Sequence, residues 1–297
     1  MENMKTKYEI IPCVEEDEDY IEEKLDAFCY TIVPPEEGAK DEDIVFKITD
    51  GEGNIIAGCI MEIESWKFAC LFTLWVDEKY RGKGLGSSLI REAEKTARKR
   101  NCYAMIIGTF DFQARPLYEK HGYKMCGITR DFPRGHELYD FLKRLDRPVQ
   151  EYVPSKDLSA CFEINQGDEK DAEIIRQGLR DYDTSQAGCS NEHIPLNKKA
   201  LDENGNIIAA IFAGVGRWNH FYIDMVWVEE PYRNQRIGSE LLAEAEREAK
   251  ERGAYFAQTE LATDWNVEFF KKNGYTVVGA WEDVPKGHVT YILEKRF

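Results

Sequence analysis

The sequence predicts an α/β protein made of two tandem domains that share one fold, each built on a mixed sheet. Three observations lead to this prediction. The chain repeats itself over most of its length. The strand and helix patterns follow the order β-α-β-β-β-α-β-α-β-β in both copies, and in each copy one strand leads through a glycine-bearing turn into a helix. A chain of 297 residues is long enough for two such domains, each with its own hydrophobic core.

The repeat has a constant spacing over most of each copy. Trp75 and Trp227 are 152 positions apart (227 − 75), whereas near the start of each copy Ile10 and Ile164 are 154 apart (164 − 10). Roughly thirty of about ninety aligned positions are identical, and the period far exceeds the ~20–50 residues of a solenoid unit. Each copy is therefore a whole domain, and the second has lost two residues after its first helix.

The domain boundaries follow from the repeat and from one polar segment. We expect an N-terminal domain over residues 1–146, a linker over 147–159 and a C-terminal domain over 160–297. The connecting segment contains prolines at 148 and 154 among polar residues, as is typical of an inter-domain connection.

The elements of the first copy follow from local patterns. Apolar side chains recur at helical spacing within an acidic segment that ends before Pro34 and Pro35, and the loop glycines of residues 50–54 separate two β-rich runs. Leu89, Ile90, Ala93 and Ala97 form one helical face. In chain order we predict a strand at 8–13, a helix at 17–30, strands at 43–49, 55–63 and 68–76, a helix at 85–100, a strand at 103–108, a helix at 114–121 and a hairpin at 123–142. The second copy follows the same path from residue 162 to 297.

Composition excludes several classes of protein. Hydrophobic residues make up 43% and charged residues 32% of the chain, as in soluble globular proteins. No apolar run approaches the ~18 residues of a membrane span, and no apolar stretch follows the first residues to form a signal peptide. The formal net charge of −16 argues against a nucleic-acid partner, because phosphate binding needs a basic face.

The cysteines indicate a reducing compartment. The eight cysteines form no Cys-x-x-Cys pair, and their positions are not repeated between the copies. We therefore expect reduced, mostly buried thiols in a cytoplasmic protein, without a membrane partner.

Two motifs resemble the GNAT superfamily of N-acetyltransferases. The first is the Arg81-Gly-Lys-Gly84-Leu-Gly86 turn after the strand that contains Trp75, and the second is Gln113-Ala-Arg-Pro-Leu-Tyr118-Glu-Lys-His-Gly-Tyr123. The resemblance covers nearly the whole chain, once per half. It implies that each domain is a mixed, mostly antiparallel sheet flanked by helices. It also implies transfer of an acetyl group from acetyl-CoA, as co-substrate, to a primary amine without a metal.

The resemblance implies two sets of residues for binding acetyl-CoA. Backbone N–H groups of the turn would hold the pyrophosphate at the positive end of a helix dipole, and the strand before it would pair with the pantetheine amides. In the first copy the implied set is Leu74, Trp75, Val76, Arg81, Gly82, Lys83, Gly84, Leu85, Gly86, Ser87 and Gln113. In the second copy it is Trp227, Val228, Arg233, Gly238, Ser239 and Asn266. Arg236 replaces Gly84 there, and we expect a helical φ at that position to tolerate it.

Tyr118 is the implied acid of the first copy. The family keeps a tyrosine there that hydrogen-bonds or protonates the CoA sulfur, and a phenol with a pKa near ~10 is a suitable donor to a thiolate. The alternative is an aromatic core residue of an amphipathic helix. The second copy has Phe270 at this position and lacks the hydroxyl.

The general base is predicted only for the second copy. The resemblance implies a carboxylate on the fourth strand, and Asp224 stands there, whereas the first copy has Phe72. Glu62 and Glu64 on the neighbouring strand could act through a water, or could be ordinary solvated residues of a strand. An amine that arrives unprotonated would need no protein base, so the base of the first half stays unassigned.

A histidine recurs in the last hairpin of each copy. The Pro and Gly around His136 and His288 predict a tight turn, and a structural role is the first interpretation. The alternative is that His136 contacts substrate or relays a proton, because histidine titrates near neutral pH. The other histidines show no spacing typical of a metal site, so we expect no metal.

We expect an active enzyme whose chemistry lies mainly in the N-terminal half, with the C-terminal half as a divergent copy. Two alternatives stay open: an acetyl-CoA-binding regulatory or structural protein with one or both halves silent, and an acidic interaction protein without enzymatic activity. The acceptor is a small-molecule or peptide amine, and acidic segments hint that it is cationic. Two fused copies could form an intramolecular pseudo-dimer within a monomeric chain.

Overall fold

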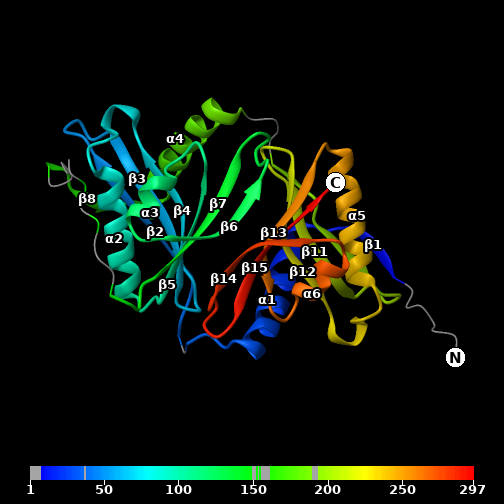
Figure 1. Cartoon of the computed structure of the whole chain (residues 1–297). Coiled ribbons are helices and arrows are strands. Elements are labelled where there is room, and N and C mark those ends of the chain that lie inside the picture. Colours follow the sequence, from blue (N-terminus) through cyan, green and yellow to red (C-terminus); the bar gives the residue numbers. More distant parts are fainter. Residues whose placement is uncertain (1–7, 37, 149–151, 153, 155–160, 189–192) are drawn as a thin grey trace. The chain divides into compact units, whose positions relative to one another are not determined.

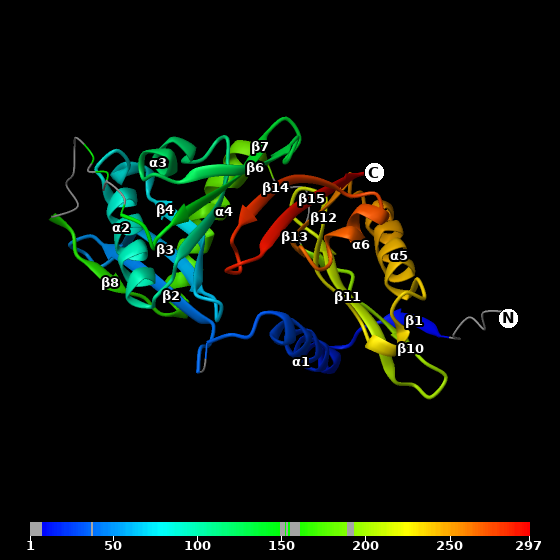
Figure 2. The same ribbon diagram turned by 60° about the horizontal axis from the view of Figure 1, so that its bottom comes forward.

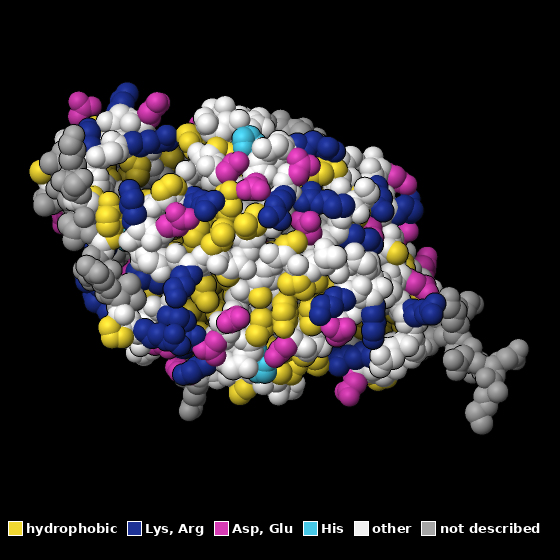
Figure 3. All heavy atoms as spheres, viewed as in Figure 1, with side chains coloured by type: hydrophobic (Ala, Val, Ile, Leu, Met, Phe, Trp, Pro, Cys, Tyr) yellow, Lys and Arg dark blue, Asp and Glu magenta, His cyan; other side chains and the backbone are white. Residues whose placement is uncertain are grey.

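The computed structural model describes residues 8–36, 38–148, 152, 154, 161–188 and 193–297, without the side chains of 261 and 262. Within this part, the helices and strands of the first copy follow the predicted order, with ends shifted by a few residues, and the second copy differs by an additional short strand at Ile194–Pro195. No helix in the described residues is long and apolar enough to cross a membrane. The face shown in Figure 3 has both acidic and basic side chains among exposed apolar groups.

The chain folds into two compact units that differ from the two sequence halves. Unit 1 contains Met1–Pro34, Cys189–Ala280 and His288–Phe297, and unit 2 contains Pro35–Gly188 and Trp281–Gly287. The first strand and helix of each half therefore belong with the sheet of the other half. The compact units therefore cross the boundaries that describe the repeat, which are 1–146, 147–159 and 160–297.

Unit 2 is a mixed sheet with helices against it (Figures 1 and 2). Its strand order is β6-β7-β5-β4-β3-β2-β8. The pairs are antiparallel except β4 with β5. Its elements are β2 (Glu42–Thr49), β3 (Ile55–Ile63), β4 (Phe68–Val76), η1 (Glu78–Tyr80), α2 (Leu85–Lys99), β5 (Ala104–Phe110), α3 (Arg115–Lys120), β6 (Lys124–Arg130), β7 (Glu137–Arg144), β8 (Ile164–Gln166) and α4 (Glu169–Ala187).

Unit 1 has the same architecture. Its strand order is β1-β10-β11-β12-β13-β15-β14, with the short β9 paired to β11. Its elements are β1 (Glu9–Pro12), α1 (Glu15–Ile32), β9 (Ile194–Pro195), β10 (Lys198–Leu201), β11 (Ile207–Val215), β12 (His220–Val228), η3 (Glu230–Tyr232), α5 (Ile237–Glu251), β13 (Phe256–Thr263), α6 (Val267–Lys272), β14 (Thr276–Glu282) and β15 (Val289–Arg296). β14 ends with Trp281 and Glu282, which belong to unit 2.

Each unit has its own core between a helix and its sheet. In unit 2 the fully buried Leu89 and Ile90 of α2 pack with Met105 and Phe141, and in unit 1 Leu241 of α5 packs with Phe221 and Ala257. None of the seven described cysteines forms a disulfide: Cys59, Cys70 and Cys102 are buried, Cys13, Cys29 and Cys126 are half-buried, and Cys161 is exposed.

The exchanged helices are held by matching contacts. In unit 2, α4 lies against β3 and β4 of the first half, and Lys47 of β2 forms an ion pair of 2.7 Å with Asp171 of α4. In unit 1, Lys199 of β10 forms the equivalent ion pair of 2.6 Å with Asp17 of α1. The exchange is thus reciprocal, and it places residues of α4 beside the motifs of the first half.

Candidate active site

The turn after β4 has the conformation that its glycines predict. Gly82 and Gly84 have φ of 72° and 87°, in the left-handed region that favours glycine. The Arg81 Nε donates a hydrogen bond of 3.0 Å to the Val76 carbonyl, which ties the turn to the end of β4. α2 then begins at Leu85, so the free N–H groups of its first turn and its positive dipole end face the same place.

β4 separates from β5 beside this turn. The parallel pairing of the two strands ends at Leu71 and Ile107, although β4 continues to Val76. Residues 72–76 therefore extend past the last pair with β5, along the floor of a pocket. A strand segment of this kind can hydrogen-bond to an extended ligand as a further strand would.

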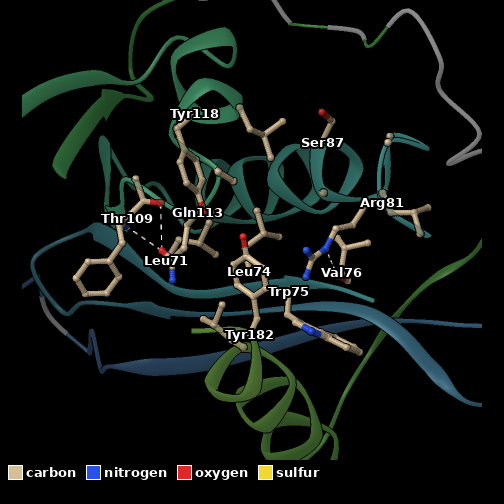
Figure 4. A pocket seen from close by; sticks show the side chains of 18 of the residues that line it. Leu71, Leu74, Trp75, Val76, Arg81, Ser87, Thr109, Gln113, Tyr118 and Tyr182 are labelled. Carbon is tan, nitrogen blue, oxygen red and sulfur yellow. Dashed lines mark hydrogen bonds between the residues drawn. The ribbon is translucent and has the colours of Figure 1, made fainter. Parts of the chain in front are cut away.

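A pocket of about 650 Å³ brings most of the predicted residues of the first copy together (Figure 4). Tyr118 lines it, and so do all the predicted cofactor-binding residues of the first copy except Lys83, namely Leu74, Trp75, Val76, Arg81, Gly82, Gly84, Leu85, Gly86, Ser87 and Gln113. The ammonium of Lys83 lies 4.6 Å from the centre of the Tyr80 ring instead. The volume lies within the ~300–1,000 Å³ that is usual for sites of small ligands.

Tyr118 is both a core residue and a residue of the pocket wall. It comes from α3, is 6% exposed, and its ring lies 6.0 Å from that of Tyr123 and 6.4 Å from that of Phe141. Burial raises the pKa of Tyr118 above its ordinary value, so the hydroxyl stays protonated at neutral pH. It can donate a hydrogen bond into the pocket, whereas complete transfer of its proton is made harder by the raised pKa.

The opposite wall consists of residues that the sequence analysis did not single out. Leu179, Tyr182 and Asp183 of α4 line the pocket. The Tyr182 hydroxyl donates to the Phe112 carbonyl at 2.7 Å, and the Tyr182 ring lies 4.4 Å from the Arg81 guanidinium carbon. Asp183 is 5% exposed, although it is ionisable. A signal was available, because Asp183 falls at helical spacing with the buried Ala172 and Ile175.

Gln113 connects the end of β5 with α4. Its Oε1 accepts hydrogen bonds from the Phe110 N–H at 3.0 Å and from the Thr109 hydroxyl at 3.2 Å. Its Nε2 donates a hydrogen bond of 2.7 Å to Asp183 Oδ1. The two acceptor contacts fix which end of the amide faces Asp183.

The corresponding turn in unit 1 keeps its backbone conformation without the glycines. Arg233 Nε donates to the Val228 carbonyl at 2.9 Å, and Asn234 and Arg236 have φ of 62° and 71°. The expected helical φ at Arg236 is wrong: the position is left-handed, which is strained for a residue with a side chain. The backbone of this turn therefore follows the same path as the turn after β4, despite the strain at Arg236.

The other residues of unit 1 that the resemblance assigns to acetyl-CoA binding make core contacts or local backbone contacts. Trp227 is buried with Ile21 of α1, Val228 packs against the unit 1 core, and Gly238 is buried in the first turn of α5, next to the half-buried Ser239. Asn266 Oδ1 accepts a hydrogen bond of 2.7 Å from the Thr263 N–H, three residues earlier in the chain. Gln113 of unit 2 accepts a hydrogen bond from the Phe110 N–H in the same way. Phe270 is buried.

Asp224 lies in unit 1, whereas Tyr118 lies in unit 2, and Asp224 does not line the pocket. The residue is exposed on β12, yet surrounding protein partly desolvates its carboxylate and raises its pKa to about 6. Burial, together with the negative charge of Asp224, raises the pKa of Glu260 on β13 to about 7. Glu260 Oε1 also accepts a hydrogen bond of 3.0 Å from Gln258.

The hairpin histidines are paired with aspartates and do not line the pocket. His136 Nδ1 lies 3.0 Å from Asp111 Oδ1, and His288 Nδ1 lies 3.1 Å from Asp264 Oδ2. Both rings are half-buried and pack edge-on against an aromatic ring. This repetition in both units agrees with the structural interpretation of the hairpin.

Glu62 and Glu64 form an acidic group with Asp41 beside β3. One carboxylate oxygen of each lies within 4.8 Å of the others, and this is the group among the described residues whose geometry could hold a cation. Burial and the charges of Glu62 and Asp41 raise the pKa of Glu64 to about 7. None of the three lines the pocket.

Comparisons with known proteins identify the family of the chain. The model of the acetyltransferase (GNAT) family matches residues 8–123 and 157–275. A blasticidin-S acetyltransferase of Streptomyces morookaense is 36% identical over 96 residues, which cover 32% of this chain and 71% of that protein. An acetyltransferase of Agrobacterium fabrum is 29% identical over 124 residues, 41% of this chain and 88% of that protein.

Two solved structures each align with about half of this chain. An acetyltransferase from Bacillus cereus has 31% identity and a TM-score of 0.43, and it covers 46% of this chain and 96% of its own. An acetyltransferase from Agrobacterium tumefaciens has 24% identity and a TM-score of 0.40, and it covers 51% of this chain and 99% of its own.

Proposed function

The chain belongs to the GNAT family of acetyltransferases, and from this premise we propose that it transfers the acetyl group of acetyl-CoA to a primary amine at a single site in unit 2. The observation that supports this most is the pocket itself. It combines the glycine turn, the free end of β4, the Tyr118 hydroxyl and a wall from α4. In unit 1 the counterpart of Tyr118 is Phe270, which has no hydroxyl to donate.

The turn and the end of β4 would bind the co-substrate. The N–H groups at the start of α2 suit a pyrophosphate, because they converge on one point and the helix dipole favours negative charge there. The backbone of residues 74–76 suits the amides of the pantetheine arm. Arg81 holds this arrangement together, because it bonds to the Val76 carbonyl and stacks on Tyr182.

Tyr118 would stabilise the leaving thiolate. As the amine attacks the thioester carbon, negative charge develops on the carbonyl oxygen and later on the sulfur. Because burial raises the pKa of Tyr118, its hydroxyl stays protonated and would donate a hydrogen bond to the sulfur. Asp224 is absent from the lining of this pocket, so this proposal gives it no part in the reaction there.

Two measurements test this function. Titration calorimetry with acetyl-CoA should give one site per chain for the full-length protein. Release of free CoA should then occur with at least one amine of a panel containing blasticidin S, a polyamine, an aminoglycoside and a lysine peptide. Blasticidin S is included because it is named in the 36% identical relative.

The variants Arg81→Ala and Arg233→Ala form a matched pair, because they remove the equivalent arginine from each turn. We expect Arg81→Ala to weaken acetyl-CoA binding and turnover and Arg233→Ala to leave both near wild type. Two sites per chain, or loss of turnover only with Arg233→Ala, would contradict the assignment to unit 2.

A further inference from the structure

A buried carboxylate forms part of the wall of the pocket. Asp183 of α4 is 5% exposed, lines the pocket, and is the one carboxylate among the lining residues that the structure describes. Removing a carboxylate from water is costly, so a buried one is retained where its charge is used or compensated. The surrounding lining is largely aromatic and apolar, with Trp75, Phe110 and Tyr182 among its rings.

Gln113 holds this carboxylate in a defined position. Its amide oxygen accepts hydrogen bonds from the Phe110 N–H and the Thr109 hydroxyl, and its Nε2 donates a hydrogen bond of 2.7 Å to Asp183 Oδ1. The amide is neutral, so this contact orients the aspartate and brings no opposite charge with it. A carboxylate in a pocket that is also lined by aromatic rings suits an ammonium or guanidinium group, through charge-assisted hydrogen bonds and cation–π attraction.

Unit 1 provides an internal comparison for this position. Tyr182 and Asp183 correspond to Phe28 and Cys29, which precede them by 154 positions (182 − 28). The exchanged helix docks in the same way in both units, because Arg233 lies 4.4 Å from the Phe28 ring just as Arg81 lies 4.4 Å from that of Tyr182. Docking therefore does not need a carboxylate at this position.

We infer that Asp183 binds a positively charged group of the acceptor, other than the amine that is acetylated. The reacting amine must be neutral to attack, so the charge of Asp183 serves a second cationic centre on the same molecule. The second sequence half thus supplies the acceptor specificity of a site whose acetyl-CoA motifs come from the first half. This inference rests on the proposed function and names the substrate class of the same site.

The test uses two acceptors of equal reach, hexane-1,6-diamine and hexylamine, which differ in one positive charge. Asp183→Asn removes the charge but retains an acceptor for Gln113, so the fold should be preserved. The control Asp181→Asn makes the same change on the same helix, at an exposed residue that accepts a hydrogen bond from Gln177. Kinetics are measured by CoA release in the full-length protein, and diamine binding to the acetyl-CoA-saturated protein is measured by equilibrium dialysis.

We expect wild type and Asp181→Asn to prefer the diamine. In Asp183→Asn, KM and Kd for the diamine should rise at least about tenfold, as for the loss of one buried charge contact, while the values for hexylamine change little. The affinity for acetyl-CoA should not change.

Three results separate the possibilities. If wild type shows no preference for the diamine in either measurement, the inference is overturned. An equal loss of kcat with both acceptors would also overturn it, because Asp183 would then act on the reacting amine. Preferential diamine binding without CoA release from any amine of the panel would overturn the proposed function and leave the recognition by Asp183 standing.

Discussion

Tyr118 of the first copy and the corresponding Phe270 of the second differ by one hydroxyl group. Both side chains are buried on equivalent short helices, and each contacts the aromatic ring that follows, Tyr123 at 6.0 Å and Tyr275 at 5.6 Å. The packing is therefore conserved between the units while the hydroxyl is not. This separates a core role, which a phenyl ring can fulfil, from a chemical role, which needs the oxygen.

Tyr118→Phe should lower kcat about a hundredfold or more, because a donor to the leaving sulfur contributes on that scale. The KM for acetyl-CoA and the melting temperature should change little, since Phe270 fills the same place in unit 1. Steady-state kinetics by CoA release would measure the effect. Tyr123→Phe is the matched control, because Tyr123 is also buried but does not line the pocket, and it should retain turnover. A Tyr118→Phe enzyme with wild-type kcat would restrict Tyr118 to the core.

At the scale of elements, α4 has the largest influence on the site. It is fixed to the sheet by the Lys47–Asp171 ion pair and by close packing at Gly178. A Cβ at Gly178 would lie 2.4 Å from Cε2 of Trp75, so glycine allows the helix to lie directly on the indole of β4. The same approach brings Leu179, Tyr182 and Asp183 to the pocket wall.

Gly178→Ala should lower the free energy of unfolding by about 1–3 kcal/mol through overpacking, which exceeds the roughly 1 kcal/mol that alanine gains in helix propensity. Acetyl-CoA should bind more weakly, because displacement of α4 moves the Tyr182 ring away from Arg81. Urea denaturation and titration calorimetry would measure the two effects.

Gly51→Ala serves as the control for this variant. Gly51 lies in an exposed turn, and a Cβ added there would have no heavy atom within 4 Å, so the same substitution should change neither quantity. An increase in stability for Gly178→Ala would mean that α4 does not lie directly on Trp75.

At the scale of the whole molecule, the distinctive feature is the reciprocal exchange of the first strand and helix between the halves. β1 pairs with β10, and β8 pairs with β2. The family model still matches each half in sequence order, at 8–123 and 157–275. The complete pocket thus depends on both halves, although the motifs that we propose bind acetyl-CoA come from one.

A double-mutant cycle should detect this exchange. Lys47→Met and Asp171→Asn together should show a coupling energy of about 0.5–1 kcal/mol, as expected for a partly buried ion pair. Lys47→Met combined with Asp17→Asn should show none, because Asp17 pairs with Lys199. Urea denaturation of the single and double variants gives both values. Coupling of Lys47 to Asp17 in place of Asp171 would mean that each first helix packs on the sheet of its own half.

Local sequence patterns were sufficient to predict the helices and strands, the duplication and the glycine turn. Helical and strand periodicity, together with the positive φ that Gly82 and Gly84 adopt without strain, are local properties that one stretch of chain expresses alone. The residues of the turn and Tyr118 were found for the same reason. Reciprocal docking was not predictable, because the two ion pairs use the same residue types at corresponding positions of the copies. The lysines are Lys47 and Lys199, and the aspartates are Asp17 and Asp171.

The sheet that each first helix covers became apparent from the folded molecule alone. An amphipathic helix specifies an apolar surface as its partner, and the two related sheets offer that surface equally well. The partner is settled by contacts between residues distant in sequence, such as Gly178 with Trp75 and Asp183 with Gln113. The sequence therefore identified the side of the pocket that we propose binds acetyl-CoA, whereas the wall from α4 and its buried carboxylate became visible only in the folded molecule.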